Sequence, residues 1–418
     1  MPDGTIAITS LAAGGSGVGR LPDGMTVFVP RTAPGDEVLL GELRRKRRFA
    51  LAVAADVVRA GPGRVAPPCP HFERDRCGGC QWQHLAMTAQ HEAKRRIVGD
   101  ALRRLGRLDV ADPDLVPSPR ALGYRATITL TVRRTASRTI AGFHDARDPS
   151  RVFALDACLI ARDEVAAVWR AVRGRLDALP EGDDVRLKLR LDDDGGLHVI
   201  VEGGTRAWTE AGPLLDAVTA AGLEATIWWR PAGGAVRRMA GLAADSGAAA
   251  FAQVNPDVAR QLREAVLASA APPGQTARVL DLYAGSGDTA LPLAAAGLEV
   301  IMVEAEERAV QRAEARARER GVQLRCIAAR VEDVLAGLLP ADVVIVNPPR
   351  TGLAAEVTDV LGGVPPRRLV YVSCDPATLA RDLARLAAAS FQVMSVRAFD
   401  MFPQTSHVET LVVVERAA

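Results

Sequence analysis

The stretch "VLDLYAGSGDTAL" (279–291) places a Gly-x-Gly turn between an apolar run typical of a buried strand and a segment that predicts a helix. At such a turn, Gly285 and Gly287 let a ligand approach the backbone closely beside the helix N-terminus. The next predicted strand, in "VIMVEAEE", ends at Glu304. A carboxylate there can accept hydrogen bonds from both hydroxyls of a ribose, so the stretch predicts a ligand that resembles a nucleotide.

The segments around this turn alternate between helix and strand from about residue 254 onward, which predicts a parallel, doubly wound sheet. Ala290 stands where a dinucleotide-binding loop has its third glycine. The pattern of a strand, D-x-x-x-G-x-G, a helix and a second-strand acid instead resembles that of the class I S-adenosylmethionine methyltransferases. Another kind of nucleotide-binding α/β domain is the remaining alternative.

A second stretch, "YVSCDPATLARD" (371–382), contains the end of a β-like apolar run, a cysteine and the start of a helix. Asp375 and Pro376 are typical of an N-cap and a first helical residue, so Cys374 is expected at the carboxyl end of a strand. Open α/β sheets carry their chemistry at such ends. The helix N-terminus favours a thiolate, whereas the Asp375 charge opposes it. These residues alone leave open a buried cysteine that only fills space.

The motif "VNPPR" (346–350) closes a later strand and is expected beside the methyl donor. An Asn-Pro-Pro turn also occurs in methyltransferases of exocyclic amines, where the Asn side chain and a backbone carbonyl hold the amine. Methylation of an amine is therefore an alternative function. It leaves Cys374 unexplained, because that reaction needs no covalent nucleophile.

A cluster of cysteines lies earlier in the chain. Cys69, Cys77 and Cys80 form C-x7-C-x2-C, and Cys158 follows in "LDACLI". Three or four thiolates suit an iron–sulfur cluster or zinc, and His71 and His84 could complete a mixed zinc site. The C-x3-C-x2-C spacing of radical S-adenosylmethionine enzymes is absent. The spacing alone leaves zinc and an iron–sulfur cluster equally open.

The composition is that of a globular protein, with 418 residues, 48% of them hydrophobic and 24% charged, and predicts two or three domains. The sequence shows no signal peptide and no run of about 20 apolar residues that would span a membrane. A cytoplasmic location is therefore expected. In that reducing compartment six cysteines are expected to be ligands or nucleophiles rather than disulfides.

The N-terminal part of the chain is basic, and its sequence pattern predicts β structure. Residues 1–108 hold 17 Lys and Arg against 10 Asp and Glu, which suggests a polyanionic partner. Within residues 1–60, short alternating apolar runs are cut by Gly and Pro-Gly turns, which predicts a small barrel of the oligonucleotide-binding type. The basic run "RRKRR" (44–48) could contact phosphates or could be only a solvated strand end. A β domain that merely packs against its neighbour is the alternative.

The order of the motifs resembles that of the bacterial RNA uracil-5-methyltransferases, which make 5-methyluridine in ribosomal or transfer RNA. The motifs are the small barrel, "CGGCQWQH", "DLYAGSGD", "NPPRTGL", "SCDPATLARD" and "DMFPQTSHVETLVVV". The resemblance implies a multidomain α/β protein. Its parts would be a TRAM RNA-binding barrel (1–60), a central α+β domain with an iron–sulfur cluster (61–250) and a Rossmann-like class I methyltransferase domain (251–418).

The resemblance also implies roles for individual residues. Cys374 matches the nucleophile and Glu409 the general base. Contacts to S-adenosylmethionine are implied for Gln253, Tyr283, Gly285, Gly287, Asp288, Glu304 and Asn347, and ligation of a four-iron, four-sulfur cluster for Cys69, Cys77, Cys80 and Cys158. Asn347 departs from the family, which usually has Asp at this position, and at Asp288 some members carry Asn. The expected partner is RNA, with 23S rRNA favoured over tRNA, and the expected state is a monomer. A non-catalytic RNA-binding protein is a further alternative.

Overall fold

The computed structural model describes residues 4–136, 138–204, 208–242, 253–270, 277–389 and 391–416. The chain forms two compact units, neither of which is one continuous stretch of sequence. The first unit holds residues 1–90, 119–257 and 403–405, and the second holds residues 91–118, 258–402 and 406–418. Helix α2 (Met87–Arg104) crosses the boundary between them.

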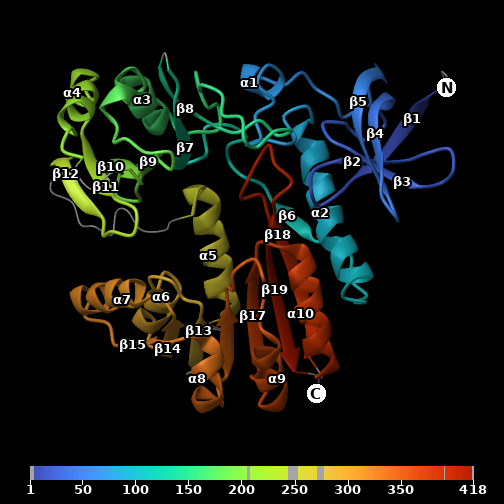
Figure 1. Cartoon of the computed structure of the whole chain (residues 1–418). Helices are drawn as coiled ribbons and strands as arrows, with labels where there is room; N and C mark the ends of the chain where they lie inside the picture. The colour runs from blue at the N-terminus through green and yellow to red at the C-terminus, as the bar shows by residue number, and fades with distance from the viewer. Residues whose placement is uncertain are drawn as a thin grey trace. The chain divides into compact units, whose positions relative to one another are not determined.

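The first unit begins with a closed five-stranded barrel, as the sequence predicted (Figure 1). Its strands are β1 (Thr5–Leu11), β2 (Gly17–Arg20), β3 (Thr26–Val29), β4 (Glu37–Arg45) and β5 (Ala50–Arg59), joined in the order β1-β2-β3-β5-β4. Alternate apolar side chains such as Ile6, Ile8, Val27 and Val29 fill the barrel. This period of two is what a strand requires when one face is buried.

The rest of the first unit is built on a six-stranded sheet in the order β12-β11-β10-β9-β7-β8. The strands are β7 (Thr127–Arg134), β8 (Thr139–Gly142), β9 (Arg186–Leu191), β10 (Leu197–Glu202), β11 (Ala225–Arg230) and β12 (Arg237–Gly241). Helices α3 (Asp163–Val172) and α4 (Gly212–Ala220) lie together on one side of it, with the 3-10 turn η1 (Arg173–Ala178) between them in sequence (Figure 1). Ile128, Leu130 and Val132 face these helices and share their core. The short helix α1 (Pro70–Glu73) precedes this sheet in the chain.

The second unit contains an eight-stranded sheet in the order β15-β14-β13-β16-β17-β19-β18-β6. The strands are β6 (Asp114–Val116), β13 (Arg278–Leu282), β14 (Glu299–Glu304), β15 (Arg325–Ala328), β16 (Val343–Val346), β17 (Arg368–Ser373), β18 (Phe391–Phe399) and β19 (Glu409–Arg416). Strands β13 to β17 are parallel, and β19 runs antiparallel to both of its neighbours. The predicted doubly wound sheet is therefore present, with one reversed strand near its edge.

Helices cover both faces of this sheet (Figure 1). They are α5 (Pro256–Ala270), α6 (Ala290–Ala295), α7 (Glu307–Glu319), α8 (Val331–Leu338), α9 (Ala355–Gly363) and α10 (Pro376–Ala388). Successive residues of one strand enter different cores: Val344 and Val346 pack with α8 to α10, whereas Val343 and Ile345 pack with α5 and α6. Burial on both faces explains the uninterrupted apolar run of β16.

The strand order places a topological switch point between β13 and β16. From β13 the chain continues outward to β14 and β15, and then returns to β16 on the other side of β13. The loops that leave the carboxyl ends of these two strands diverge, and ligands of open α/β sheets bind in the crevice between such loops. The glycine turn and the Asn-Pro-Pro motif are those two loops.

Candidate active site and cysteine-lined cavity

The glycine turn after β13 has a backbone that few side chains allow. Tyr283, Gly285 and Gly287 have positive φ angles of 59°, 56° and 78°. A Cβ at Gly287 would lie 3.2 Å from the Cβ of Ala313 and 3.4 Å from the sulfur of Met302, whereas one at Gly285 would meet no atom within 4 Å. Gly287 therefore serves the fold, and Gly285 leaves open backbone where a ligand can approach.

Glu304 holds this turn from the end of the neighbouring strand β14. Its Oε2 accepts a hydrogen bond from the Gly285 N–H at 2.9 Å, and its Oε1 accepts one from the Glu306 N–H at 2.9 Å. Each carboxylate oxygen has a second lone pair. The predicted pair of glycine turn and acid is thus assembled, with capacity left for the hydroxyls of a ribose.

Two aspartates flank the turn. Asp281, within β13, is buried, and burial raises its pKa to about 7. Its Oδ2 has no hydrogen-bond partner among the described residues. Asp281 is the first residue of the D-x-x-x-G-x-G pattern, which was the available signal for a role of its own. Asp288 is half-exposed and accepts a hydrogen bond from Arg316 at 2.7 Å. The open backbone, the Glu304 oxygens and the unsatisfied Asp281 oxygen make a donor and acceptor set that fits an adenosyl group.

Cys374 follows β17 directly, as expected, and precedes α10. The Asp375 carboxylate caps that helix by accepting hydrogen bonds from the N–H groups of Ala377 and Thr378, both at 2.9 Å. Strand β17 pairs with the antiparallel β19, where Ser373 lies opposite Thr410. Cys374 and Glu409 are the next residues of the two strands in that register, so the predicted nucleophile and base lie at the same end of adjacent strands.

The charges around Cys374 and Glu409 include one that acts on both. Burial raises the pKa of the half-buried Cys374 thiol, the Glu409 charge raises it further, and the Arg350 guanidinium opposes both effects. Burial also raises the pKa of Glu409, to about 7, and Arg350 again opposes the shift. Arg350 therefore lies near both groups. Arg350 is the last residue of "VNPPR", and a cation directly after that turn was the available signal for its role.

All seven predicted contacts to the methyl donor remain predictions, including those of Asn347 and Gln253. Asn347 follows β16 and donates its backbone N–H to the Leu282 carbonyl at 3.3 Å, which puts it at the switch point. Gln253 belongs to the first unit, whereas the glycine turn belongs to the second.

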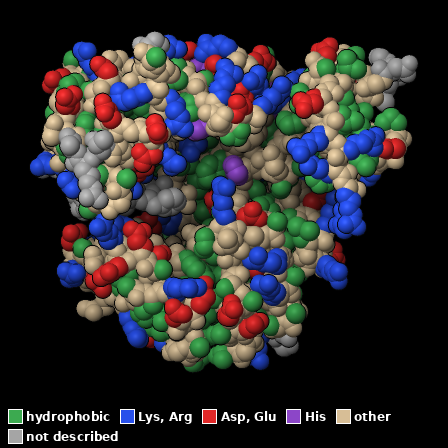
Figure 2. All heavy atoms as spheres, in the orientation of Figure 1, with side chains coloured by type: hydrophobic (Ala, Val, Ile, Leu, Met, Phe, Trp, Pro, Cys, Tyr) green, Lys and Arg blue, Asp and Glu red, His purple; other side chains and the backbone are tan. Residues whose placement is uncertain are grey.

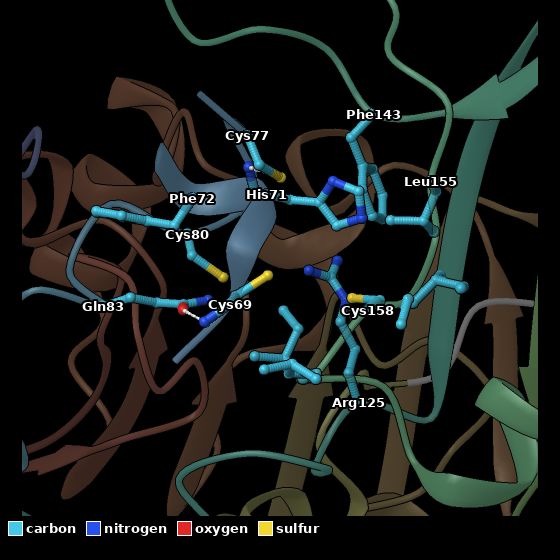
Figure 3. Close-up of a pocket in the computed structure, with 15 residues that line it drawn as sticks. Cys69, His71, Phe72, Cys77, Cys80, Gln83, Arg125, Phe143, Leu155 and Cys158 are labelled. Carbon is cyan, nitrogen blue, oxygen red and sulfur yellow. Dashed lines mark hydrogen bonds between the residues drawn. The ribbon is translucent and has the colours of Figure 1, made fainter. Parts of the chain in front are cut away.

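The four cysteines Cys69, Cys77, Cys80 and Cys158 line one cavity in the first unit (Figure 3). Three come from the segment around α1 and the fourth from the loop before α3. None forms a disulfide. Burial raises the pKa of Cys77 to about 11 and of Cys80 to about 12, so these thiols stay protonated until a metal displaces the protons. The wall is otherwise largely apolar, and Arg125 contributes a positive charge.

The histidines near this cavity do not complete a zinc site. His71 Nε2 accepts a hydrogen bond from the Asp156 backbone N–H at 3.0 Å, so its Nδ1 carries the proton that is donated to Asp75 at 2.7 Å. His84 stacks on Phe72 instead of lining the cavity. Within the described ranges, no three His, Cys, Asp or Glu side chains are arranged to hold one metal ion.

This result gives a mononuclear zinc site no support, and it leaves the iron–sulfur cluster as a prediction. The ligands of a four-iron cluster bind different iron atoms and so lie farther apart than the ligands of a single ion. Four unpaired thiols around a small apolar cavity with a nearby cation are a donor set that fits such an anionic cluster.

The basic run 44–48 is exposed at the turn between β4 and β5, as a phosphate-binding segment would have to be. Arg45 is paired with Asp23 at 2.5 Å. Phe49 and Leu51 beside the run are also partly exposed. Lys and Arg side chains gather on the lower side of the barrel in the space-filling view (Figure 2). No helix in the described part of the chain is long and apolar enough to cross a membrane.

Comparison with known proteins agrees with these features. The model of the tRNA (Uracil-5-)-methyltransferase family matches residues 244–417. The chain is 34% identical to a 23S rRNA (uracil(1939)-C(5))-methyltransferase RlmD of Azoarcus sp., over 99% of both chains. It is 32% identical to the RlmD of Halomonas elongata, over 98% of this chain and 89% of the other.

Among solved structures, the tRNA (uracil-54, C5)-methyltransferase of Pyrococcus abyssi in complex with S-adenosyl-L-homocysteine shares the fold. It superposes with a TM-score of 0.75 at 24% identity and covers 98% of this chain and 99% of its own. The identity of the full-length relatives and the family match lead to one conclusion. The chain belongs to the RNA uracil-5-methyltransferase family, and it is an S-adenosylmethionine-dependent enzyme of that family.

Proposed function

We propose that this enzyme methylates carbon 5 of one uridine in RNA, with 23S rRNA as the favoured substrate, through a covalent adduct between Cys374 and the uracil. The observation that carries the proposal is the pairing of β17 with β19, which brings Cys374 and Glu409 to the same end of adjacent strands. The names of the full-length relatives favour ribosomal over transfer RNA.

The residues match the needs of the reaction. Carbon 5 of uracil is a weak nucleophile. When Cys374 has lost its proton, its sulfur bonds to carbon 6, and the electrons of the 5,6 double bond move onto the ring as an enolate. Carbon 5 then bonds to the methyl carbon of S-adenosylmethionine, and the bond from that carbon to the sulfonium sulfur breaks. S-Adenosylhomocysteine is left.

Glu409 completes the cycle by taking the proton of carbon 5. The electrons of that C–H bond restore the double bond, and the bond to the Cys374 sulfur breaks. A carboxylate is ordinarily too weak a base for this step near neutral pH, but burial raises the Glu409 pKa to about 7. The uridine must leave its stack to reach a thiol at a strand end, which favours a loop or a remodelled RNA.

The methyl donor would occupy the crevice at the switch point. The proposed contacts are Gln253, Tyr283, Gly285, Gly287, Asp288, Glu304 and Asn347. The Glu304 carboxylate and the open backbone at Gly285 support this assignment. Retention of S-adenosylmethionine binding in a Cys374→Ala variant, with loss in Glu304→Ala, would test it.

A four-iron, four-sulfur cluster would bind Cys69, Cys77, Cys80 and Cys158 and would serve as a structural cross-link. It would tie the segment around α1 to the loop before α3 within the first unit. We further propose that residues 1–60, 61–250 and 251–418 act as the TRAM barrel, the cluster domain and the methyltransferase domain of a cytoplasmic monomer. In this scheme the barrel contacts RNA through residues 44–48.

Nucleoside mass spectrometry of RNA from a strain that lacks the gene tests the function. The loss of 5-methyluridine from 23S rRNA, restored by the wild-type gene and not by Cys374→Ala, is the expected result. Loss of a methylated exocyclic amine would instead favour the alternative suggested by the Asn347-Pro348-Pro349 turn. An unchanged nucleoside profile and no binding of S-adenosylmethionine would favour a non-catalytic RNA-binding protein.

A further inference from the structure

The start of α10 holds the loop that follows β16. The Thr378 hydroxyl lies 3.2 Å from the carbonyl oxygen of Arg350, with the carbonyl of Asp375 at 3.3 Å as its other acceptor. One turn later, the Arg381 guanidinium donates to the carbonyl of Thr351 at 2.8 Å. Residues three apart on a helix share one face. This face of α10 therefore binds backbone carbonyl groups of the loop, and the first of them belongs to Arg350.

Asp382 is the buried centre of these contacts. Its side chain is fully buried, and its Oδ2 accepts hydrogen bonds from the Leu353 N–H at 2.7 Å and from the Tyr371 hydroxyl at 2.9 Å. Its Oδ1 accepts one from the Arg381 Nε at 2.9 Å. A Cβ at Gly352 would lie only 2.4 Å from Oδ2, so the loop approaches the carboxylate as closely as a glycine allows.

These contacts connect the two segments that frame the nucleophile. Tyr371 lies in β17, three residues before Cys374, and Leu353 lies in the loop that Arg350 opens. The carboxylate of Asp382 thus fixes the loop against the strand. Removing a buried hydrogen-bonded carboxylate leaves its donors without partners, so the anchored arrangement depends strongly on this one group.

We propose that Asp382, supported by Arg381 and Thr378, is a positioning residue that holds Arg350 beside Cys374. The proposal rests on the proposed role of Cys374 as the nucleophile. Within the part of the chain that the structure describes, the charged groups that act most strongly on the Cys374 thiol are Glu409 from β19, Asp375 from the start of α10 and Arg350 from the loop. Only Arg350 is positive, so any displacement of the loop leaves the thiol facing two carboxylates and disfavours its ionised form.

Alkylation of the purified, full-length enzyme by iodoacetamide tests the proposal without RNA. The rate at Cys374, followed by mass spectrometry of its peptide across a pH series, reports the fraction of thiolate. Asp382→Asn keeps the shape of the side chain but cannot pair with Arg381 as an anion. We expect it to move the midpoint of alkylation upward by about one pH unit, which is about tenfold slower modification at neutral pH. Thr378→Val should shift it in the same direction by less.

Three further variants make the result specific. Arg385→Gln removes a cation that lies 3.7 Å from the same Asp382 oxygen but touches none of the loop contacts above, so its midpoint should stay at the wild-type value. Arg350→Gln should give the largest shift. Adding Asp382→Asn to Arg350→Gln should change nothing more, because both act through one cation.

An Asp382→Asn midpoint equal to wild type, or a double variant in which the shifts add, would overturn the proposal. Equal shifts in Arg385→Gln and Asp382→Asn would overturn it too, since they would show a general effect on α10. Binding of S-adenosylmethionine checks that each variant is folded. If Asp382→Asn does not fold, the alkylation midpoint of Thr378→Val tests the proposal in its place. A wrong assignment of Cys374 as the nucleophile would be seen in a different experiment, because methylation would then survive Cys374→Ala.

Discussion

Cys374 and Cys80 place the same functional group in two different surroundings. Cys374 is half-buried at the end of a strand, beside a helix N-terminus and within the influence of the Arg350 charge. Cys80 is buried in a cavity with three other thiols, and burial raises its pKa to about 12. A single thiol at a strand end with a route to solvent suits a nucleophile. Several thiols that share one buried cavity suit metal ligation.

The largest effect expected from this contrast is in Cys374→Ala. Without the thiol the enolate cannot form, so methylation should fall by on the order of 10⁴-fold or more. Incorporation of label from S-adenosylmethionine into RNA measures this loss, and binding of the donor should be unchanged. If Cys374→Ala methylates RNA at a rate close to that of the wild type, Cys374 is not the nucleophile and its surroundings do not distinguish it in function from Cys80.

The partner of the nucleophile provides the next test. Glu409→Gln should permit attack and methyl transfer but slow elimination about 10²- to 10⁴-fold. A protein–RNA band that survives denaturing electrophoresis and carries the methyl label should then accumulate. It should be absent from the double variant with Cys374→Ala. Turnover of Glu409→Gln near the wild-type rate would remove Glu409 from the mechanism.

In the wild-type enzyme, the titration of Glu409 should appear in the pH dependence of the elimination rate. Because burial raises the Glu409 pKa to about 7, its carboxyl group is protonated and inactive as a base below that pH. The rate of elimination should therefore fall about tenfold per pH unit below about 7 and level off above it. Single-turnover decay of the adduct measures this rate. A profile flat between pH 5 and 8 would contradict the assignment.

The cavity should respond to substitution through stability. Cys80→Ser should lose iron and lower the unfolding temperature by on the order of 10 °C, because a bound cluster is part of the folding free energy. Cys326→Ser on β15 is the matched control, since that thiol lies outside the cavity. Iron analysis and thermal unfolding of anaerobically purified protein provide the measurements. Stoichiometric zinc without iron would show that the cavity binds a different metal.

The fold was largely predictable from local patterns. Alternating apolar residues between Gly turns predicted the barrel, and the alternation of helical and strand segments from about residue 254 predicted the parallel sheet. The three-residue strand β6 was not predictable. Only its pairing with β18 makes it a strand, and that partner lies more than 270 residues later in the chain.

The candidate site likewise has features that local sequence predicts and features that depend on distant contacts. The register of β17 with β19 places Cys374 and Glu409 at the ends of adjacent strands, which no local pattern predicted, and their chemical roles stay predictions. The alternative of a mixed zinc site with His71 gains no support, because the Asp156 N–H donates to its Nε2, a contact between residues 85 positions apart. Arg350 was missed for a similar reason. Its importance comes from neighbours on two other segments, which no local pattern contains.

The position of β19 between β17 and β18 has a consequence for the order in which the enzyme becomes competent during synthesis. A nascent chain that has emerged only through α10 already contains the thiol, but β17 still has an unpaired edge. Glu409 arrives with the strand that closes this edge. The carboxylate proposed to act in product release is therefore added by the same event that completes the sheet, so no partly synthesised chain has both an open sheet and the complete proposed site.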